Sequence, residues 1–191
     1  MTTIVYDVKT NTLHGDRQCI VDMSSWLYYN TDGQKVFMSP DRKIAFGSTG
    51  QNYGDEEVAT FFKDIRTVLD LFYKTKDGES LEVDGVWGSL MNRSILIFTK
   101  EYLFTRRQGL GMSILDKTQN HTVGSGRLTA LALQRANEKL NLGLSIDDIY
   151  KAISRSERLT NSTVDSIDLN ELVPYIDIVT PTESEVTHHP V

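Results

Sequence analysis

The sequence predicts one domain of mixed helices and strands, in which hairpins come first, helices follow and further strands close the chain. Three observations indicate this organisation. Short β-rich runs alternate with tight-turn signals over residues 3–48. Apolar residues then recur at helical spacing over residues 58–72, and helical segments return after Arg127. The length of 191 residues is enough for one compact domain with its own core.

The first quarter of the chain reads as strands joined by turns. Lys9-Thr10-Asn11 and Asp32-Gly33 are turn signals, and Ser39-Pro40-Asp41-Arg42 is a third. The strands expected around these turns are Thr3–Val8, Thr12–Val21, Lys35–Met38 and Lys43–Ser48.

Helical periodicity begins near Asp55, which is a candidate cap, and ends near Lys74. One apolar stripe is expected to face the core; its members are Val58, Phe61, Phe62, Ile65, Leu69 and Phe72. A second helix is expected from Arg127 to a C-terminal end at Gly143. Its expected buried face consists of Leu128, Leu131, Ala132 and Leu140.

Ser145-Ile146-Asp147-Asp148 resembles an N-terminal capping arrangement for a third helix that runs to about Ser156. This helix is expected to bury Ile149, Ala152 and Ile153. Four more strands are expected, at Ser94–Thr99, Tyr102–Arg106, Thr163–Ile167 and Tyr175–Val179. We therefore expect a single domain over residues 1–180 and a mobile C-terminal tail over residues 181–191.

Composition excludes several classes of function. The net charge of −6 and the absence of a long Lys/Arg-rich run argue against binding to duplex nucleic acid. No apolar stretch is long enough to span a bilayer, and the start shows no secretory signal pattern. A single cysteine, Cys19, rules out an internal disulfide, which fits the cytoplasm. His14 and His121 lack neighbours at a metal-ligand spacing, so no metal site is expected.

The start of the chain carries the main chemical signal. Met1 is followed by the small residue Thr2, and removal of Met1 would leave Thr2 with a free α-amine beside its hydroxyl. Such a pair can act as nucleophile and built-in general base. A small polar residue after methionine is common, so this feature depends on partner residues further along the chain.

Four further motifs follow in order. They are His14-Gly15-Asp16-Arg17, Gln34-Lys35-Val36, Ile44-Ala45-Phe46-Gly47-Ser48-Thr49-Gly50 and Gly124-Ser125-Gly126. Taken singly, each has an ordinary structural interpretation, such as a solvated strand residue or a routine helix entry. Together with Thr2-Thr3-Ile4-Val5, their order and spacing resemble the proteasome β-subunit family, most closely HslV peptidase, within the N-terminal-nucleophile hydrolases. The resemblance covers residues 2–50 and about 94–161.

The resemblance implies an α+β fold, a four-layer αββα sandwich with two antiparallel sheets between helix layers. It implies Thr2 as the nucleophile, with Asp16 and Lys35 as its charged partners. Gly47 would donate its N–H to the oxyanion, and Ser125 would steady the water or the amine. No cofactor is implied for the chemistry, although a structural monovalent cation near Thr160 is expected.

These residue types suit amide hydrolysis through an acyl-enzyme. A terminal amine has a lower pKa than a lysine side chain and is therefore a better base near neutral pH. Lys35 would discourage protonation of that amine, and Asp16 would give the buried lysine its counter-ion. A glycine N–H suits an oxyanion because no Cβ blocks the approach.

Three functions follow from these observations. The first is a threonine-type peptidase acting on polypeptide in a homo-oligomeric ring, with an ATP-dependent unfoldase as partner. The second is a catalytically inactive assembly or interaction protein of the same fold. The third is an amidase acting on a small molecule. Residues 75–92 contain Asp77-Gly78, Asp84-Gly85 and Trp87-Gly88 where the family usually has a second long helix, and this departure bears on ring assembly.

Overall fold

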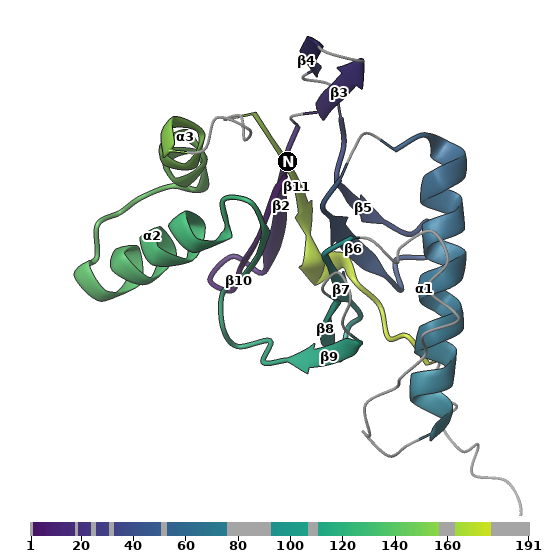
Figure 1. Ribbon diagram of the computed structural model, residues 1–191. Coiled ribbons are helices and arrows are strands. Elements are labelled where there is room, and N and C mark those ends of the chain that lie inside the picture. Colours follow the sequence, from purple (N-terminus) through teal and green to yellow (C-terminus); the bar gives the residue numbers. More distant parts are fainter. Residues whose placement is uncertain are drawn as a thin grey trace, which may run out of the picture.

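A computed structural model describes residues 2–17, 19–23, 26–30, 33–50, 53–75, 93–106, 111–156 and 163–176. These ranges contain two main antiparallel sheets, a separate hairpin and three α-helices (Figure 1). The helices are α1 (Asp55–Thr75), α2 (Arg127–Leu140) and α3 (Ile146–Ser156).

The first sheet has four strands in the order β10-β1-β2-β11. Its strands are β10 (His121–Gly124), β1 (Thr3–Asp7), β2 (Thr12–Asp16) and β11 (Val164–Asp168). The second sheet runs in the order β5-β6-β7-β8-β9. Its strands are β5 (Val36–Met38), β6 (Ala45–Ser48), β7 (Ile95–Phe98), β8 (Leu103–Arg106) and β9 (Met112–Leu115). A separate hairpin pairs β3 (Cys19–Met23) with β4 (Trp26–Asn30).

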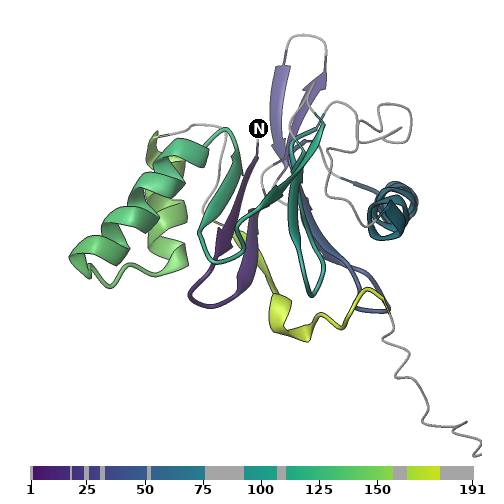
Figure 2. The ribbon, with the colours of Figure 1, turned by 90° about the horizontal axis from the view of Figure 1, so that it is seen from below.

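Three apolar clusters hold the layers together. The cluster around Phe46, Phe61 and Ile97 joins the second sheet to α1. A second cluster, which includes Ile4 and Leu96, fills the space between the two sheets. A third joins the first sheet to α2 and α3. The layers therefore stack as helix, sheet, sheet, helices, as Figure 2 shows, and the expected α+β αββα sandwich is confirmed.

Strand β7 shows why this sequence forms a central strand. Its four residues, Ile95-Leu96-Ile97-Phe98, are all fully buried. Ile95 and Ile97 face the α1 cluster, whereas Leu96 and Phe98 face the space between the sheets. A strand that is covered on both faces reads as a continuous apolar run because neither face meets water.

Several expected elements agree with the structure. Strands lie at the expected places in β1, β5, β6, β7, β8 and β11. Helices α1 and α3 lie where the first and third helices were expected. Ser145 forms the expected cap of α3: its hydroxyl accepts from Asp148 N at 3.2 Å, and Asp148 Oδ2 accepts from Ser145 N at 3.1 Å.

The structure corrects three strand expectations. The strand expected over Thr12–Val21 ends at Asp16, and the chain leaves the sheet after Arg17, whose N–H bonds to Thr163 O at 3.0 Å. Strands β4, β9 and β10 were not expected. Tyr175 and Ile176 form a bend rather than the start of a closing strand. The rest of that expected strand and the tail over residues 181–191 lie outside the described residues.

The expected buried face of α2 is wrong. Leu128 and Leu140 are 72% and 68% exposed, while Ala130 and Gln134 are the buried residues. Because Ala130 and Gln134 are one turn apart, they share the face that meets the first sheet. The helix also ends earlier than expected, at Leu140, and its C-cap residue Asn141 takes the left-handed conformation.

Candidate active site

The two sheets bring five chain segments together at one end of the sandwich. These are the start of β1, the end of β2, the start of β5, the segment after β6 and the turn after β10. Thr2 precedes β1 and is 1% exposed. Its backbone carbonyl accepts a hydrogen bond from Ser125 N at 2.9 Å, which fixes the N-terminal segment beside the entry to α2.

The Thr2 hydroxyl meets the backbone of Gly50. Thr2 Oγ1 donates to Gly50 O at 3.1 Å, and Gly50 N lies 3.4 Å from the same oxygen. The predicted nucleophile is therefore held against the backbone of Gly50 rather than against another side chain.

Asp16 and Lys35 form a buried ion pair next to this threonine. Lys35 Nζ lies 3.1 Å from Asp16 Oδ1, and both side chains are 0% exposed. Asp16 Oδ2 accepts from Thr3 N at 2.5 Å, so the carboxylate also binds the residue that follows the predicted nucleophile. Two opposite charges in the same buried position compensate each other's loss of hydration. The structure thus brings Thr2, Asp16 and Lys35 together.

The predicted oxyanion donor, Gly47, lies inside β6, opposite Val36 on one side and Leu96 on the other. Thr49 N bonds to Ser94 O two residues further on. The alternation of antiparallel ladders then makes Gly47 and Leu96 a hydrogen-bonded pair. The Gly47 N–H is therefore used within the sheet. Gly47 instead makes room for Ile4, because a Cβ there would lie 2.6 Å from Ile4 Cγ2.

Gly50 is the glycine at the hydroxyl, and its position requires the absence of a side chain. Its φ is +142°, and an added Cβ would lie 2.2 Å from Arg93 Nη1 and 2.8 Å from the Tyr53 hydroxyl. Arg93 donates to Tyr53 OH at 2.6 Å and its guanidinium lies 4.6 Å from the centre of the Tyr53 ring. This cation packs directly behind the Gly50 backbone.

The Gly124-Ser125-Gly126 motif lets the N-terminal segment approach α2. A Cβ at Gly124 would lie 1.7 Å from Thr2 O, and one at Gly126 would lie 2.6 Å from Thr3 Oγ1. The motif is therefore a close-contact site and not merely a flexible helix entry. Ser125 contributes its N–H to Thr2 O, as described above.

Tyr150 was not expected to belong to the site. Its hydroxyl donates to Thr3 O at 3.0 Å and His14 O at 3.1 Å, so it fastens α3 to β1 and β2. Burial and the nearby negative charge of Asp16 raise the pKa of Tyr150 well above its ordinary value. Tyr150 therefore stays protonated and keeps its donor role.

Two further predictions cannot be placed. Met1 and the expected cation site near Thr160 lie outside the described residues. Within the described ranges, no group of three or more His, Cys, Asp or Glu side chains could hold a metal ion. None of the helices described there is long and apolar enough to cross a membrane.

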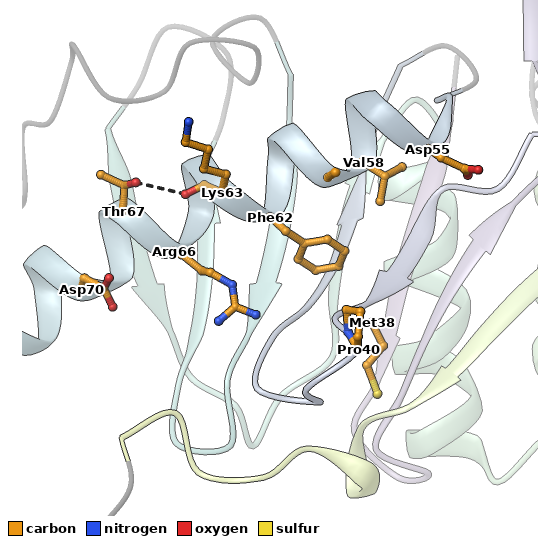
Figure 3. Close-up of a pocket in the computed structure, with 10 residues that line it drawn as sticks. Met38, Pro40, Asp55, Val58, Phe62, Lys63, Arg66, Thr67 and Asp70 are labelled. Carbon is orange, nitrogen blue, oxygen red and sulfur yellow. Dashed lines mark hydrogen bonds between the residues drawn. The ribbon is translucent and has the colours of Figure 1, made fainter.

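A shallow hollow of about 640 Å³ runs along α1. Figure 3 shows Phe62 of α1 turned toward Met38 and Pro40 at the end of β5. Lys63, Arg66 and Asp70 add charge to its sides. None of the predicted site residues lines this hollow, so it is separate from Thr2.

Comparisons with known proteins agree with this fold. No family model matches the sequence, and no curated protein matches it. Among solved structures, eukaryotic HslV from Trypanosoma brucei aligns with a TM-score of 0.56 and 13% identity, over 86% of this chain and 97% of that chain. Thiobacillus denitrificans BPH in complex with epoxomicin aligns with a TM-score of 0.50 and 15% identity, over 87% of this chain and 97% of that chain. A second structure of Thiobacillus denitrificans BPH aligns with a TM-score of 0.51 and 12% identity, over 87% of this chain and 96% of that chain.

At these identities the similarity establishes the fold, which is that of proteasome-like peptidases. The comparisons do not reach the level of individual residues, so the catalytic roles of Thr2, Asp16, Lys35, Gly47 and Ser125 stay predictions.

Proposed function

We propose that this protein is a threonine-type peptidase that hydrolyses peptide bonds with Thr2 as its nucleophile, after Met1 has been removed. One observation carries the proposal: the Thr2 hydroxyl bonds to the Gly50 backbone beside the buried Asp16–Lys35 pair. A buried carboxylate–ammonium pair between the end of β2 and the residue before β5 has no evident packing advantage over apolar residues. A role in activating the adjacent hydroxyl and α-amine of Thr2 would explain why the ion pair is buried there.

In the proposed reaction the freed α-amine of Thr2 accepts the hydroxyl proton while Oγ1 attacks the substrate carbonyl carbon. The tetrahedral intermediate collapses, the peptide C–N bond breaks, and the leaving amine takes the proton from the α-ammonium. An ester between Thr2 and the acyl half of the substrate remains. Water, deprotonated by the same amine, then attacks this ester and releases the acid and the free hydroxyl.

Asp16 and Lys35 act on this amine through charge. The positive charge of Lys35 disfavours a second positive charge nearby, which keeps the amine available as a base. Asp16 holds Lys35 through Oδ1 and the Thr3 N–H through Oδ2, so one carboxylate orients both the cation and the backbone of the nucleophile. Ser125 steadies the nucleophile through its bond to Thr2 O.

Gly50 takes the oxyanion role in this proposal, in place of Gly47. The Gly50 N–H is 3.4 Å from the attacking oxygen, which is close to where a carbonyl oxygen under attack would develop its charge. Loss of one such donor typically raises the barrier by about 2.7–4 kcal/mol. The positive charge of Arg93 behind the Gly50 backbone would favour the same developing anion.

The proposal extends to a homo-oligomeric ring in the cytoplasm that receives polypeptide from an ATP-dependent unfoldase. Its support is the similarity of the whole fold to HslV. Native mass spectrometry tests the assembly separately from the chemistry, because a ring would give one dominant multiple of the 21.6 kDa chain.

Intact mass spectrometry with a peptide epoxyketone tests the chemistry. We expect loss of Met1 and a single adduct that disappears in Thr2→Ala. Thr10→Ala is the matched control, because Thr10 is an exposed threonine in the first turn, and it should keep the adduct. Retained Met1 without an adduct would overturn the proposal. An adduct together with cleavage of small amides but not peptides would assign the site to an amidase.

A further inference from the structure

A second cavity, of about 340 Å³, lies between the helix pair α2–α3 and the outer face of the first sheet. Its volume falls within the range of small-molecule sites. It opens near the turn between β1 and β2, where Asp7, Lys9 and Thr10 contribute to the lining. Asp7 is the last residue of β1, so the opening and Thr2 lie at opposite ends of that strand.

The inner lining includes two buried polar side chains, His14 and Gln134, which are 5% and 4% exposed. Nε2 of His14 and Oε1 of Gln134 have no hydrogen-bond partner among the described residues. Gln134 Nε2 donates to Tyr6 O at 3.3 Å, which fixes the amide so that Oε1 is the free acceptor. An unpaired buried polar atom costs about 1–3 kcal/mol, so two in one cavity indicate a partner that enters it.

The two asparagine side chains that line this cavity already have hydrogen-bond partners within the protein. Asn137 bonds to the backbone of Leu144 through both its amide oxygen and its amide nitrogen, each at 2.9 Å. Asn120 accepts from Val8 N at 2.9 Å and donates to Glu138. The unmet hydrogen-bonding capacity is therefore concentrated on His14 and Gln134.

The chemistry of the lining selects a neutral ligand. Burial lowers the pKa of His14 to about 4 against the opposing charges of Asp7 and Asp147, so its imidazole is uncharged near neutral pH. His14 Nδ1 lies 2.7 Å from Ser166 Oγ, and the hydroxyl can act as donor or acceptor. Either tautomer leaves Nε2 able to bond to a hydroxyl group. Gln134 Oε1 requires a donor, which a hydroxyl also supplies.

We propose that this cavity is a binding site for small neutral alcohols, whose hydroxyl group bonds to His14 and Gln134. The carbon skeleton of the ligand packs on the apolar part of the lining, Leu144, Ile146 and Ile149. With the His14 proton on Nε2 and Ser166 donating to Nδ1, one hydroxyl accepts from Nε2 and donates to Gln134 Oε1, whereas a hydrocarbon of the same size would leave both atoms unpaired. The site is independent of the proposed peptidase function.

Nuclear magnetic resonance titrations with benzyl alcohol and toluene test this proposal, because the two probes differ in the hydroxyl group. The His14 ring nitrogens are observed directly. We expect benzyl alcohol to shift the Nε2 resonance saturably and to bind at least tenfold more tightly than toluene, which corresponds to about 1.4 kcal/mol. Gln134→Leu should remove this preference, whereas Gln119→Leu at the surface should keep it.

Thr2→Ala should bind benzyl alcohol as the unaltered chain does, which separates this site from the peptidase proposal. Equal binding of the two probes, or no saturable shift with benzyl alcohol, would overturn the inference. A crystal structure that retains one water bonded to both orphaned atoms in the presence of benzyl alcohol would do the same. The comparison of probes on the unaltered chain holds even if Gln134→Leu fails to fold.

Discussion

Replacing Lys35 with methionine is the sharpest test of the Asp16–Lys35 pair. The substitution keeps most of the side-chain volume but removes the Nζ that lies 3.1 Å from Asp16 Oδ1 at a fully buried position. Removing one partner of a buried ion pair typically destabilises a protein by about 3–5 kcal/mol. Asp16 keeps its bond to Thr3 N, so we expect the low end of this range, about 3 kcal/mol. For a chain of this size, that predicts a fall in Tm of roughly 6–12 °C.

Thermal and urea unfolding, followed by circular dichroism, measure this loss. The double variant Asp16→Asn with Lys35→Met is the decisive comparison, because an asparagine can still accept from Thr3 N but brings no buried charge. We expect the double variant to be more stable than Lys35→Met alone by at least about 1 kcal/mol. Lys63→Met, at an exposed position on α1, should change stability by less than about 0.5 kcal/mol.

Two results would refute this reasoning. Lys35→Met could unfold at the same temperature as Lys63→Met, which would mean that the buried pair contributes nothing to the fold. Alternatively, the double variant could be less stable than Lys35→Met, which would mean that the unpaired charge of Asp16 is not the source of the loss.

Three more substitutions give separable outcomes. Gly50→Ala should abolish the epoxyketone adduct because its φ is +142° and an added Cβ would overlap a guanidinium nitrogen, whereas Gly54→Ala, with open space around it, should keep the adduct. Since the His14 pKa is about 4 in the folded chain against an ordinary value of 6.5, the unfolded chain binds the extra proton between these values. The free energy of unfolding should therefore fall by about 3 kcal/mol as pH drops through this window. His14→Gln should flatten this profile and His121→Gln should not; a steep profile in His14→Gln would contradict the assignment. Tyr150→Phe should cost about 1–3 kcal/mol in urea unfolding, because two buried backbone carbonyls lose a donor, and a loss under about 0.5 kcal/mol would contradict its anchoring role.

The layers of the fold were predictable from local patterns and from the resemblance together. The stripe of α1 predicts a buried face because its apolar residues recur with the helical period, and the continuous apolar run of β7 predicts a strand that is covered on both faces. The end of β2 at Asp16 was not predictable, since β-like residues continue to Val21 and the break depends on a bond to the distant Thr163. The buried face of α2 was misjudged because Gln134 is polar, and only the Tyr6 carbonyl opposite explains its burial.

The candidate site was predictable as far as ordered motifs reach. Asp16 bonds to Lys35 and to the N–H of Thr3, the residue after Thr2, and the catalytic roles of these residues stay predictions. Among the small residues after Ile44, the sequence analysis selected Gly47 as the oxyanion donor. Residue type alone does not show which backbone N–H turns toward Thr2, because this depends on the register of the sheet. Tyr150 gave no signal, since a tyrosine on a helix far along the chain is ordinarily part of a core.

The hairpin β3–β4 departs from the sandwich and returns at neighbouring points. Gly33 N bonds to Arg17 O at 3.2 Å, and the Asp16–Lys35 pair lies just inside this closure. The base of the hairpin is thus held by contacts between residues that lie outside β3 and β4. For protein engineering, this makes the hairpin a natural graft position. For evolution, it means that the projecting segment could diversify its sequence and length while the chemistry beneath it stayed unchanged.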